Sequence, residues 1–253
     1  MYRKRFGQHF LKDSSIAKKE IRYADVTKQD KVLEIGPGYG ILTKLLAEKA
    51  ELVIAVEVDP NLVFHLKKTM PSNVKIIEGD ILEMDLNELP SFNKIVSNLP
   101  FHISSPITFK LLEYNFDKAI LMYQREFAER MIAKTGDENY SRLSVMIACK
   151  AQCRILEYIS KRYFTPMPKV DACIVELIPY KMPPFHIEDE FFFSNIVREF
   201  FNHRRKKIRY TIKTLFGKID QDVPFQDRRI EELTPREIVE LSNLLYNRYS
   251  KSS

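Results

Sequence analysis

The chain has 253 residues, and 40 Lys plus Arg against 34 Asp plus Glu give it a formal net charge of +6. Hydrophobic residues make up 45% of it, which excludes a disordered chain with too few apolar residues to offset its ordering entropy. Only 7 Gly and 13 Pro exclude a collagen-like chain. The length permits one large domain, or a medium domain with a small one.

The cysteines and the N-terminal segment both indicate a reducing compartment. Cys149, Cys153 and Cys173 have no His or Cys partner at a metal-ligand spacing, so we interpret them as buried thiols and expect no metal. The basic N-terminus is followed by Gly7-Gln8-His9 and not by an apolar run, so no signal peptide is expected. No apolar stretch approaches the ~20 residues of a membrane helix. We therefore expect a cytoplasmic protein without membrane contact.

Between residue 31 and about residue 125, short apolar runs alternate with amphipathic stretches. The apolar runs predict buried strands at 31–35, 52–57, 74–78, 94–97 and 117–123. Helical spacing of apolar residues predicts helices at 41–49 and 61–70. Strands that alternate with helices pair in parallel through right-handed crossovers. The sequence therefore predicts an α/β fold with a doubly wound sheet.

Beyond this region helices dominate. The pattern predicts helices at 125–134, 143–150, 189–202, 204–216 and 234–249, and strands at 153–158 and 172–178. Prolines make residues 164–169 an extended loop, and residues 181–184 form a proline-bearing linker. We expect one domain over residues 1–182 and a small all-α domain over residues 183–253.

A glycine-rich loop follows the first predicted strand and opens the first predicted helix. Gly36 and Gly38 permit backbone angles that a side chain disfavours, and they let a ligand approach closely. Glu57 ends the second strand, where a carboxylate can accept both hydroxyl hydrogens of a ribose. The loop and this acid predict a nucleoside-type cofactor; the alternative is a tight turn without a ligand.

Two further acids bear on which cofactor this is. The loop lacks the G-x-G-x-x-G spacing of dinucleotide sites, and Glu34 would lie beside the pyrophosphate of NAD. S-adenosylmethionine has no phosphate and carries cationic groups, so it tolerates that acid. Asp80, after the third strand, could accept a hydrogen bond from an adenine amino group, or it could cap a helix.

The most specific motif follows the fourth strand, in a carboxyl-end loop where open α/β sheets bind ligands. The lone pair of an exocyclic base amine is delocalised, so acceptors aimed at its N–H groups would make it a better nucleophile. Asn98 offers an amide oxygen, Pro100 fixes the turn that presents the Leu99 carbonyl, and Phe101 offers a flat face to an extruded base. The motif predicts methyl transfer to a base amine; alone, it could also be a β-turn.

With these motifs in order, the chain resembles the rRNA adenine N6-dimethyltransferase family over nearly its whole length. The matching stretches are residues 5–11, 33–40, 57–59, 79–80, 98–101, 140–144, 164–171 and 203–209. The resemblance implies a Rossmann-like class I methyltransferase sheet with a small C-terminal all-α domain. It implies S-adenosyl-L-methionine as cofactor, and dimethylation of two adjacent adenosines near the 3′ end of small-subunit rRNA. It also implies action on a pre-ribosomal small subunit during its biogenesis. The sequence leaves the oligomeric state open, and we expect a monomer.

The resemblance also implies roles for individual residues. The implied cofactor-binding residues are His9, Leu11, Gly36, Gly38, Glu57, Asp80 and Asn98. Phe101 takes the base-stacking role, and Phe164 would clamp the other face of the base or simply pack in the core. Two positions depart from the family pattern: Phe101 stands where Tyr is usual, and His9 where Asn is common.

A basic run lies in the part that resembles the family's helical domain. Its cations are Arg204, Arg205, Lys206, Lys207 and Arg209. On one helix they would contact RNA phosphates and make binding weaken with salt; the alternative is a solvated helix face.

Two other functions remain open from the sequence, namely a ribosome-assembly factor that only docks and a DNA adenine methylase. The glycine spacing argues against an NAD enzyme.

Overall fold

The computed structural model describes residues 9–217 and 222–249. The chain forms two compact units, and each unit is built from two separate stretches of the sequence. The first comprises Met1–Ala128 and Gln152–Pro179, and the second comprises Glu129–Ala151 and Tyr180–Ser253. The expected boundary at residue 182 is close to the second crossing. The sequence pattern did not show that the segment around residues 129–151 packs with the C-terminal helices.

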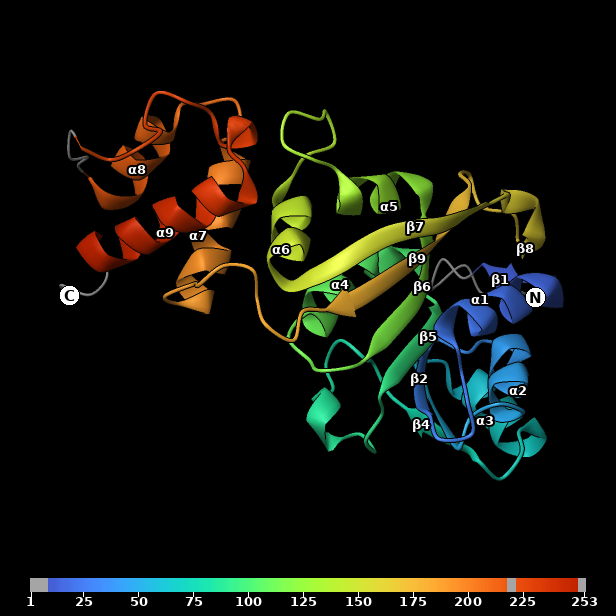
Figure 1. The fold of residues 1–253 in the computed structure, drawn as a ribbon. Helices are drawn as coiled ribbons and strands as arrows, with labels where there is room; N and C mark the ends of the chain where they lie inside the picture. Colours follow the sequence, from blue (N-terminus) through green and yellow to red (C-terminus); the bar gives the residue numbers. More distant parts are fainter. Residues whose placement is uncertain (1–8, 218–221, 250–253) are drawn as a thin grey trace. The chain divides into compact units, whose positions relative to one another are not determined.

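The first unit is built on a seven-stranded sheet with the order β4-β3-β2-β5-β6-β9-β7 (Figure 1). Its strands are β2 (Lys31–Ile35), β3 (Leu52–Glu57), β4 (Val74–Glu78), β5 (Lys94–Asn98), β6 (Lys118–Gln124), β7 (Ala151–Ile159) and β9 (Ala172–Pro179). Strands β2 to β6 pair in parallel, and β9 runs antiparallel to β6. The predicted doubly wound sheet is confirmed.

Strand β2 lies at the point where the strand order reverses. Val32 pairs with Val53 of β3 on one side and with Lys94 of β5 on the other. All of these strands run in the same direction, so their carboxyl ends meet at one edge of the sheet. Such a switch point is where open α/β sheets bind ligands.

The helices of the first unit follow the strands closely. They are α1 (Ser14–Ala24), α2 (Ile41–Ala47), α3 (Pro60–Thr69) and α4 (Ser104–Leu111), and α5 (Arg125–Ile132) runs across the unit boundary. Asp59 caps α3 by accepting a hydrogen bond from the Asn61 N–H, and Pro60 stands in the first turn. Helices α1 and α4 were not predicted. A helix is predicted from the apolar residues that recur along its buried face. In α1 that face includes a carboxylate, Glu20, so the apolar pattern is interrupted.

Short elements complete the first unit. Among its described residues, the 3₁₀ helices are η2 (Leu86–Glu88), η3 (Phe101–Ile103) and η4 (Lys161–Tyr163). Two short strands, β1 (Phe10–Leu11) and β8 (Phe164–Thr165), form a separate antiparallel ladder. β8 begins the proline-bearing segment, so the start of the predicted loop is an extended strand.

The second unit is helical. It holds α6 (Arg142–Lys150), α7 (Glu190–Asn202), α8 (Ile208–Phe216), the 3₁₀ helix η5 (Ile230–Glu232) and α9 (Pro235–Tyr249). Tyr140 ties the segment before α6 to the segment before α9, because its hydroxyl donates to the Leu233 carbonyl at 2.9 Å. None of the described helices is both long and apolar enough to cross a bilayer.

The predicted helix 204–216 is wrong at its start, because α8 begins only at Ile208. Lys207 forms an antiparallel bridge with Arg229, and the Ile208 N–H bonds to the Arg228 carbonyl at 2.9 Å. These contacts with a distant segment hold the backbone in a turn. The first four cations of the basic run therefore lie on a turn, and only Arg209 lies on the helix.

Candidate functional site

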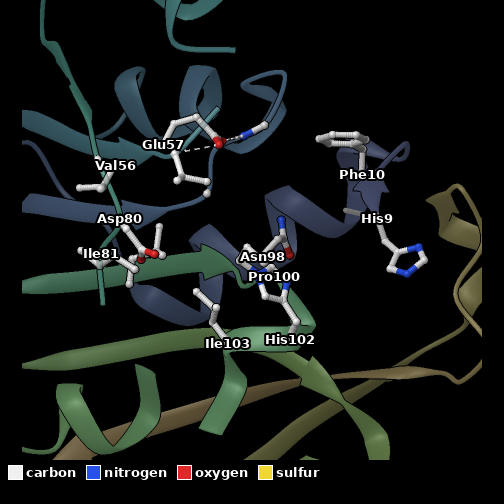
Figure 2. A pocket seen from close by; sticks show the side chains of 15 residues that line it. His9, Phe10, Val56, Glu57, Asp80, Ile81, Asn98, Pro100, His102 and Ile103 are labelled. Atoms are coloured by element: carbon white, nitrogen blue, oxygen red, sulfur yellow. Dashed lines mark hydrogen bonds between the residues drawn. The ribbon is translucent and has the colours of Figure 1, made fainter. Parts of the chain in front are cut away.

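A cavity opens at the carboxyl edge of the sheet, beside the switch point (Figure 2). Each of strands β2 to β5, or the loop that follows it, contributes to its lining, and His9 and Phe10 lie on another side. The lining residues are His9, Phe10, Ile35, Gly36, Gly38, Val56, Glu57, Val58, Gly79, Asp80, Ile81, Asn98, Pro100, His102 and Ile103. The cavity thus brings together residues of the glycine loop, both acid positions and the motif after β5.

The glycine loop needs its glycines for two reasons. Gly36 and Gly38 have φ angles of +68° and +60°, in the left-handed region that side chains disfavour. A Cβ on Gly36 would lie 3.1 Å from the ring of Pro100, and one on Gly38 would lie 2.8 Å from the ring of Phe10. The loop therefore packs directly against the motif after β5 and against β1.

Glu57 is almost fully buried, and its carboxylate already accepts three backbone hydrogen bonds. Oε1 accepts from the N–H groups of Val58 and Asp59 at 3.0 Å each, and Oε2 accepts from the Gly38 N–H at 3.2 Å. Burial raises the pKa of Glu57, and these backbone bonds oppose the rise. Since a carboxylate has about four acceptor positions, one near Oε2 remains for a ligand.

The Asp80 side chain caps a turn and also lines the cavity. Its Oδ1 accepts from the Leu82 N–H at 2.9 Å, which is a capping role. Asp80 also lines the cavity beside Ile81. The two functions foreseen for this carboxylate, a cap and a ligand contact, are therefore compatible.

Asn98 is the last residue of β5, and it lines this cavity and two adjoining ones. Among the described residues, its Oδ1 atom has no hydrogen-bond partner and is shielded from solvent. The Leu99 side chain is buried in the core, and Pro100 leads into η3, where Phe101 stands. The motif thus lies at the junction of the three cavities, with the amide oxygen turned to the buried side.

The rings of Phe101, in η3, and Phe164, in β8, lie close to each other. Their ring centroids are 6.3 Å apart and the rings are tilted by 60°. The cavity between them, which Met122 also lines, has a volume of about 10 Å³. That space holds no more than one water molecule, so a base can enter only if the rings separate.

Glu34 is a second buried acid at this edge. It lines an adjoining cavity together with Gly36, Tyr39 and Leu42. Burial raises the pKa of Glu34 to about 8, and the charge of Glu57 adds to the rise. Its Oε2 atom is shielded from solvent and has no hydrogen-bond partner among the described residues.

Only part of the basic run is free to bind phosphate. Arg204 pairs with Glu231 at 2.7 Å, and both Lys207 and Arg209 pair with Asp227. Arg205 and Lys206 are exposed, and in the part of the chain that the structure describes no ion pair involves them.

Comparison with known proteins identifies the family of this chain. The family model for ribosomal RNA adenine dimethylase matches residues 1–251. The chain belongs to this family. A Methanococcus vannielii relative named "probable ribosomal RNA small subunit methyltransferase A" is 44% identical, over 96% of this chain and 96% of its own length. A Thermococcus kodakarensis protein of the same name is 43% identical, over 94% of this chain and 88% of its own length.

Solved structures agree with this assignment. A dimethyladenosine transferase from Plasmodium falciparum superposes with a TM-score of 0.80 and 30% identity, over 95% of this chain and 98% of its own. The 23S rRNA methyltransferase ErmE superposes with a TM-score of 0.64 and 26% identity, over 91% of this chain and 99% of its own. The predicted family, the methyltransferase fold and the rRNA adenine dimethylase activity are confirmed.

In this dimethylase, His9 lines the same cavity as Glu57 and Asp80, whereas Leu11 does not line it. The His9 ring bonds through Nδ1 to the Pro166 carbonyl at 2.7 Å. Figure 2 shows this ring turned away from Asp80 and Ile81. The Leu11 side chain is buried in the core and lines the adjoining cavity that Glu34 also lines. Their cofactor contacts stay a prediction.

Sequence reasoning missed the apolar walls of the cavity, chiefly Val58, Ile81 and Ile103. Two of these directly follow a predicted acid position, Glu57 or Asp80, in carboxyl-end loops. That adjacency is the signal that could have found them, because neighbouring residues of such a loop face the same crevice.

Proposed function

We propose that this dimethylase uses S-adenosyl-L-methionine to methylate N6 twice on each of two adjacent adenosines near the 3′ end of small-subunit rRNA. The names of the Methanococcus and Thermococcus relatives support the small subunit as the target. We further propose that the rRNA is presented within a pre-ribosomal small subunit, that the reaction belongs to subunit biogenesis in the cytoplasm, and that the enzyme acts as a monomer.

The chemistry of the cavity fits this cofactor. Its described lining residues include carboxylates and apolar side chains but no Lys or Arg, which suits a ligand without phosphate. The unpartnered Oε2 of Glu34 calls for a hydrogen-bond donor or a cation. When bound, the cofactor supplies a methyl group on a positively charged sulfur. Glu57 would hold ribose hydroxyls, Asp80 the adenine amino group, and Ile81 one face of the adenine.

One observation carries the proposal: Asn98 stands where the acid-lined cavity meets the space between Phe101 and Phe164. Acceptors at Oδ1 of Asn98 and at the Leu99 carbonyl would bind the two N6–H groups and localise the nitrogen lone pair. The nitrogen lone pair would then bond to the methyl carbon as the bond between that carbon and sulfur breaks, sulfur would keep that electron pair, and one N6 proton would leave to water. Because Oδ1 is now the buried end of the amide, this role requires the amide to rotate about its last torsion, which is soft.

Phe101 and Phe164 would hold the extruded base between their rings. Stacking needs no hydroxyl, so Phe in place of the usual Tyr at position 101 is compatible with this role. Entry of the base must push the rings apart, since they leave room for only one water.

We propose that the C-terminal helical part, residues 183–253, binds RNA. All five cations of the basic run belong to this surface, but Arg205 and Lys206 are the ones without ion pairs among the described residues. Phosphate contacts there would position the RNA without selecting the base.

The test is transfer of labelled methyl groups from S-adenosyl-L-methionine to small subunits that lack the modification. We expect up to four methyl groups per subunit on two adjacent adenosines, and none from Asn98→Ala. Duplex and single-stranded DNA with adenines serve as the controls against a DNA methylase. No label on subunits, or full cellular function of Asn98→Ala, would overturn the proposal; the latter result would indicate a docking role.

A further inference from the structure

Helix α1 carries a carboxylate on the face that it buries. Its buried positions are Ile16, Ala17, Glu20, Ile21 and Ala24. Glu20 is completely shielded from solvent, and neither of its carboxyl oxygens has a hydrogen-bond partner among the described residues. An unsatisfied buried acid costs stability where an apolar residue would pack without penalty. Its presence therefore calls for a functional explanation.

Two groups at the carboxyl edge of the sheet face Glu20. α1 packs on β5, and the Asn98 amide at the end of that strand lies close enough to lower the pKa of Glu20. Burial is the larger influence and raises that pKa well above its usual value, and the charge of Glu34 from β2 adds to the rise. The hidden Oδ1 of Asn98 lacks a partner as well. Two neighbouring side chains behind the site thus each carry an unsatisfied buried acceptor.

Only two arrangements satisfy this pair. With Glu20 ionised, the amide can turn so that Nδ2 donates to the carboxylate, and Oδ1 then faces the cavity. With Glu20 protonated, its O–H can donate to the buried Oδ1, and Nδ2 then faces the cavity. The first arrangement presents an acceptor to the incoming amine and the second presents a donor.

We propose that Glu20 is a positioning residue: its carboxylate accepts a hydrogen bond from Nδ2 of Asn98 and so turns Oδ1 of Asn98 toward the cavity. This inference rests on the proposed function, because only a target amine needs an acceptor at that point. Glu20 touches neither substrate nor cofactor, and it acts through the orientation of one amide.

Two variants separate this role from a structural one. Glu20→Leu removes the acceptor and the buried acid together. We expect its kcat for methylation of undermethylated small subunits to fall about tenfold, the effect of losing one orienting hydrogen bond. The dissociation constant of S-adenosyl-L-methionine, measured by calorimetry, and KM for the subunits should be unchanged. Its melting temperature should equal or exceed that of the wild type. Ile16→Val on the same buried face is the matched control and should keep the wild-type kcat.

Glu20→Gln provides the second readout. Gln keeps an acceptor but cannot ionise, so we expect it to restore kcat to within about threefold of the wild type. The wild type should lose kcat as the pH falls and Glu20 takes up a proton, and Glu20→Gln should lack this limb. Glu34 is the other titratable group that faces Glu20, and it is intact in both proteins.

Several outcomes overturn the inference. These are a wild-type kcat in Glu20→Leu, a loss of kcat matched by weaker cofactor binding, and an unchanged acid limb in Glu20→Gln. If the wild-type protein itself transfers no methyl group to the subunit, the proposed function has failed. If it does and Glu20→Leu is equally fast, only the positioning role has failed.

Discussion

Gly36 and Pro100 are in contact, although they belong to two motifs that lie far apart in the sequence. The approach is so close that a Cβ on Gly36 would lie 3.1 Å from both Cγ and Cδ of the proline ring. The glycine loop at the end of β2 and the turn after β5 therefore hold each other in place. The position of Asn98 relative to the cavity depends on this contact.

Gly36→Ala should disturb both motifs. The φ of +68° costs an Ala side chain about 1–2 kcal/mol, and the new methyl group must also displace Pro100. We expect the free energy of unfolding to fall by at least that amount and cofactor affinity to fall at least ~10-fold. Denaturant unfolding and calorimetric titration with S-adenosyl-L-methionine measure the two effects.

Gly217→Ala is the matched control for that experiment. Gly217 has a similar φ of +73°, but a Cβ there meets nothing within 4 Å. It should lose a similar backbone energy and keep full cofactor affinity. Equal loss of affinity in both variants would show that strain alone, and not the Pro100 contact, causes the effect.

Phe101 should act through its flat ring. Phe101→Leu keeps an apolar side chain but loses the stacking face, so we expect kcat/KM for rRNA methylation to fall about 10- to 100-fold. Phe101→Tyr should stay within about threefold of the wild type, because the ring remains. Steady-state kinetics on undermethylated subunits test both variants. Similar activity of the Leu and Tyr variants would argue against stacking at this position.

The salt dependence of RNA binding should report which cations face phosphate. Each phosphate contact contributes about 0.7–0.9 to the slope of log K against log salt. Removing Arg205 and Lys206 together should therefore lower the slope by about 1–2. Lys207→Ala is the paired comparison and should change it less, because Lys207 already pairs with Asp227 at 3.2 Å. Filter binding over a range of salt concentrations gives both slopes.

Asp30 should contribute to stability at neutral pH. Burial raises its pKa, but hydrogen bonds from Asn93, Thr27 and Lys94 outweigh this and lower the pKa from 3.8 to about 2. Since the folded-state pKa lies below the usual value, the ionised carboxylate stabilises the fold above about pH 4. That stabilisation is lost as the pH falls toward 2.

Asp30→Asn should accordingly lower the free energy of unfolding by about 2 kcal/mol at pH 7. The difference from the wild type should narrow between pH 4 and pH 2, as urea unfolding at a series of pH values would show. Asp25→Asn is the control, because the Asp25 side chain is 85% exposed. A difference that does not change with pH would rule out ionisation of Asp30 as the cause.

The sheet was predictable because parallel strands buried on both faces are written as continuous apolar runs, such as Leu52–Glu57. The location of the site at the carboxyl edge could then be predicted from the sheet, because the acids and glycines stand at strand ends. Helix α1 was not predictable from its pattern, because a buried Glu20 interrupts the apolar stripe. The turn at residues 204–207 depends on pairing with Arg229, a contact that no local pattern encodes.

The site was predictable as a set of strand-end positions but not as a geometry. The burial of Asn98 Oδ1, the hydrogen bond from the Gly38 N–H to Glu57 and the ion pairs of the basic run all arise from residues distant in sequence. Motif spacing contains no information on which end of an amide faces inward, or on which cations are already neutralised.

The ladder between β1 and β8 bears on how the enzyme matures during synthesis. His9 bonds to the carbonyl of Pro166, 157 positions later in the chain, and Leu11 pairs with Phe164. A nascent chain that has released only its first hundred residues can assemble the strands that bear the acids, but it has no partner for β1. The ladder can therefore form only after the ribosome has delivered residues 164–166. During translation the strands that bear the acids can therefore assemble first, and the ladder between β1 and β8 forms last.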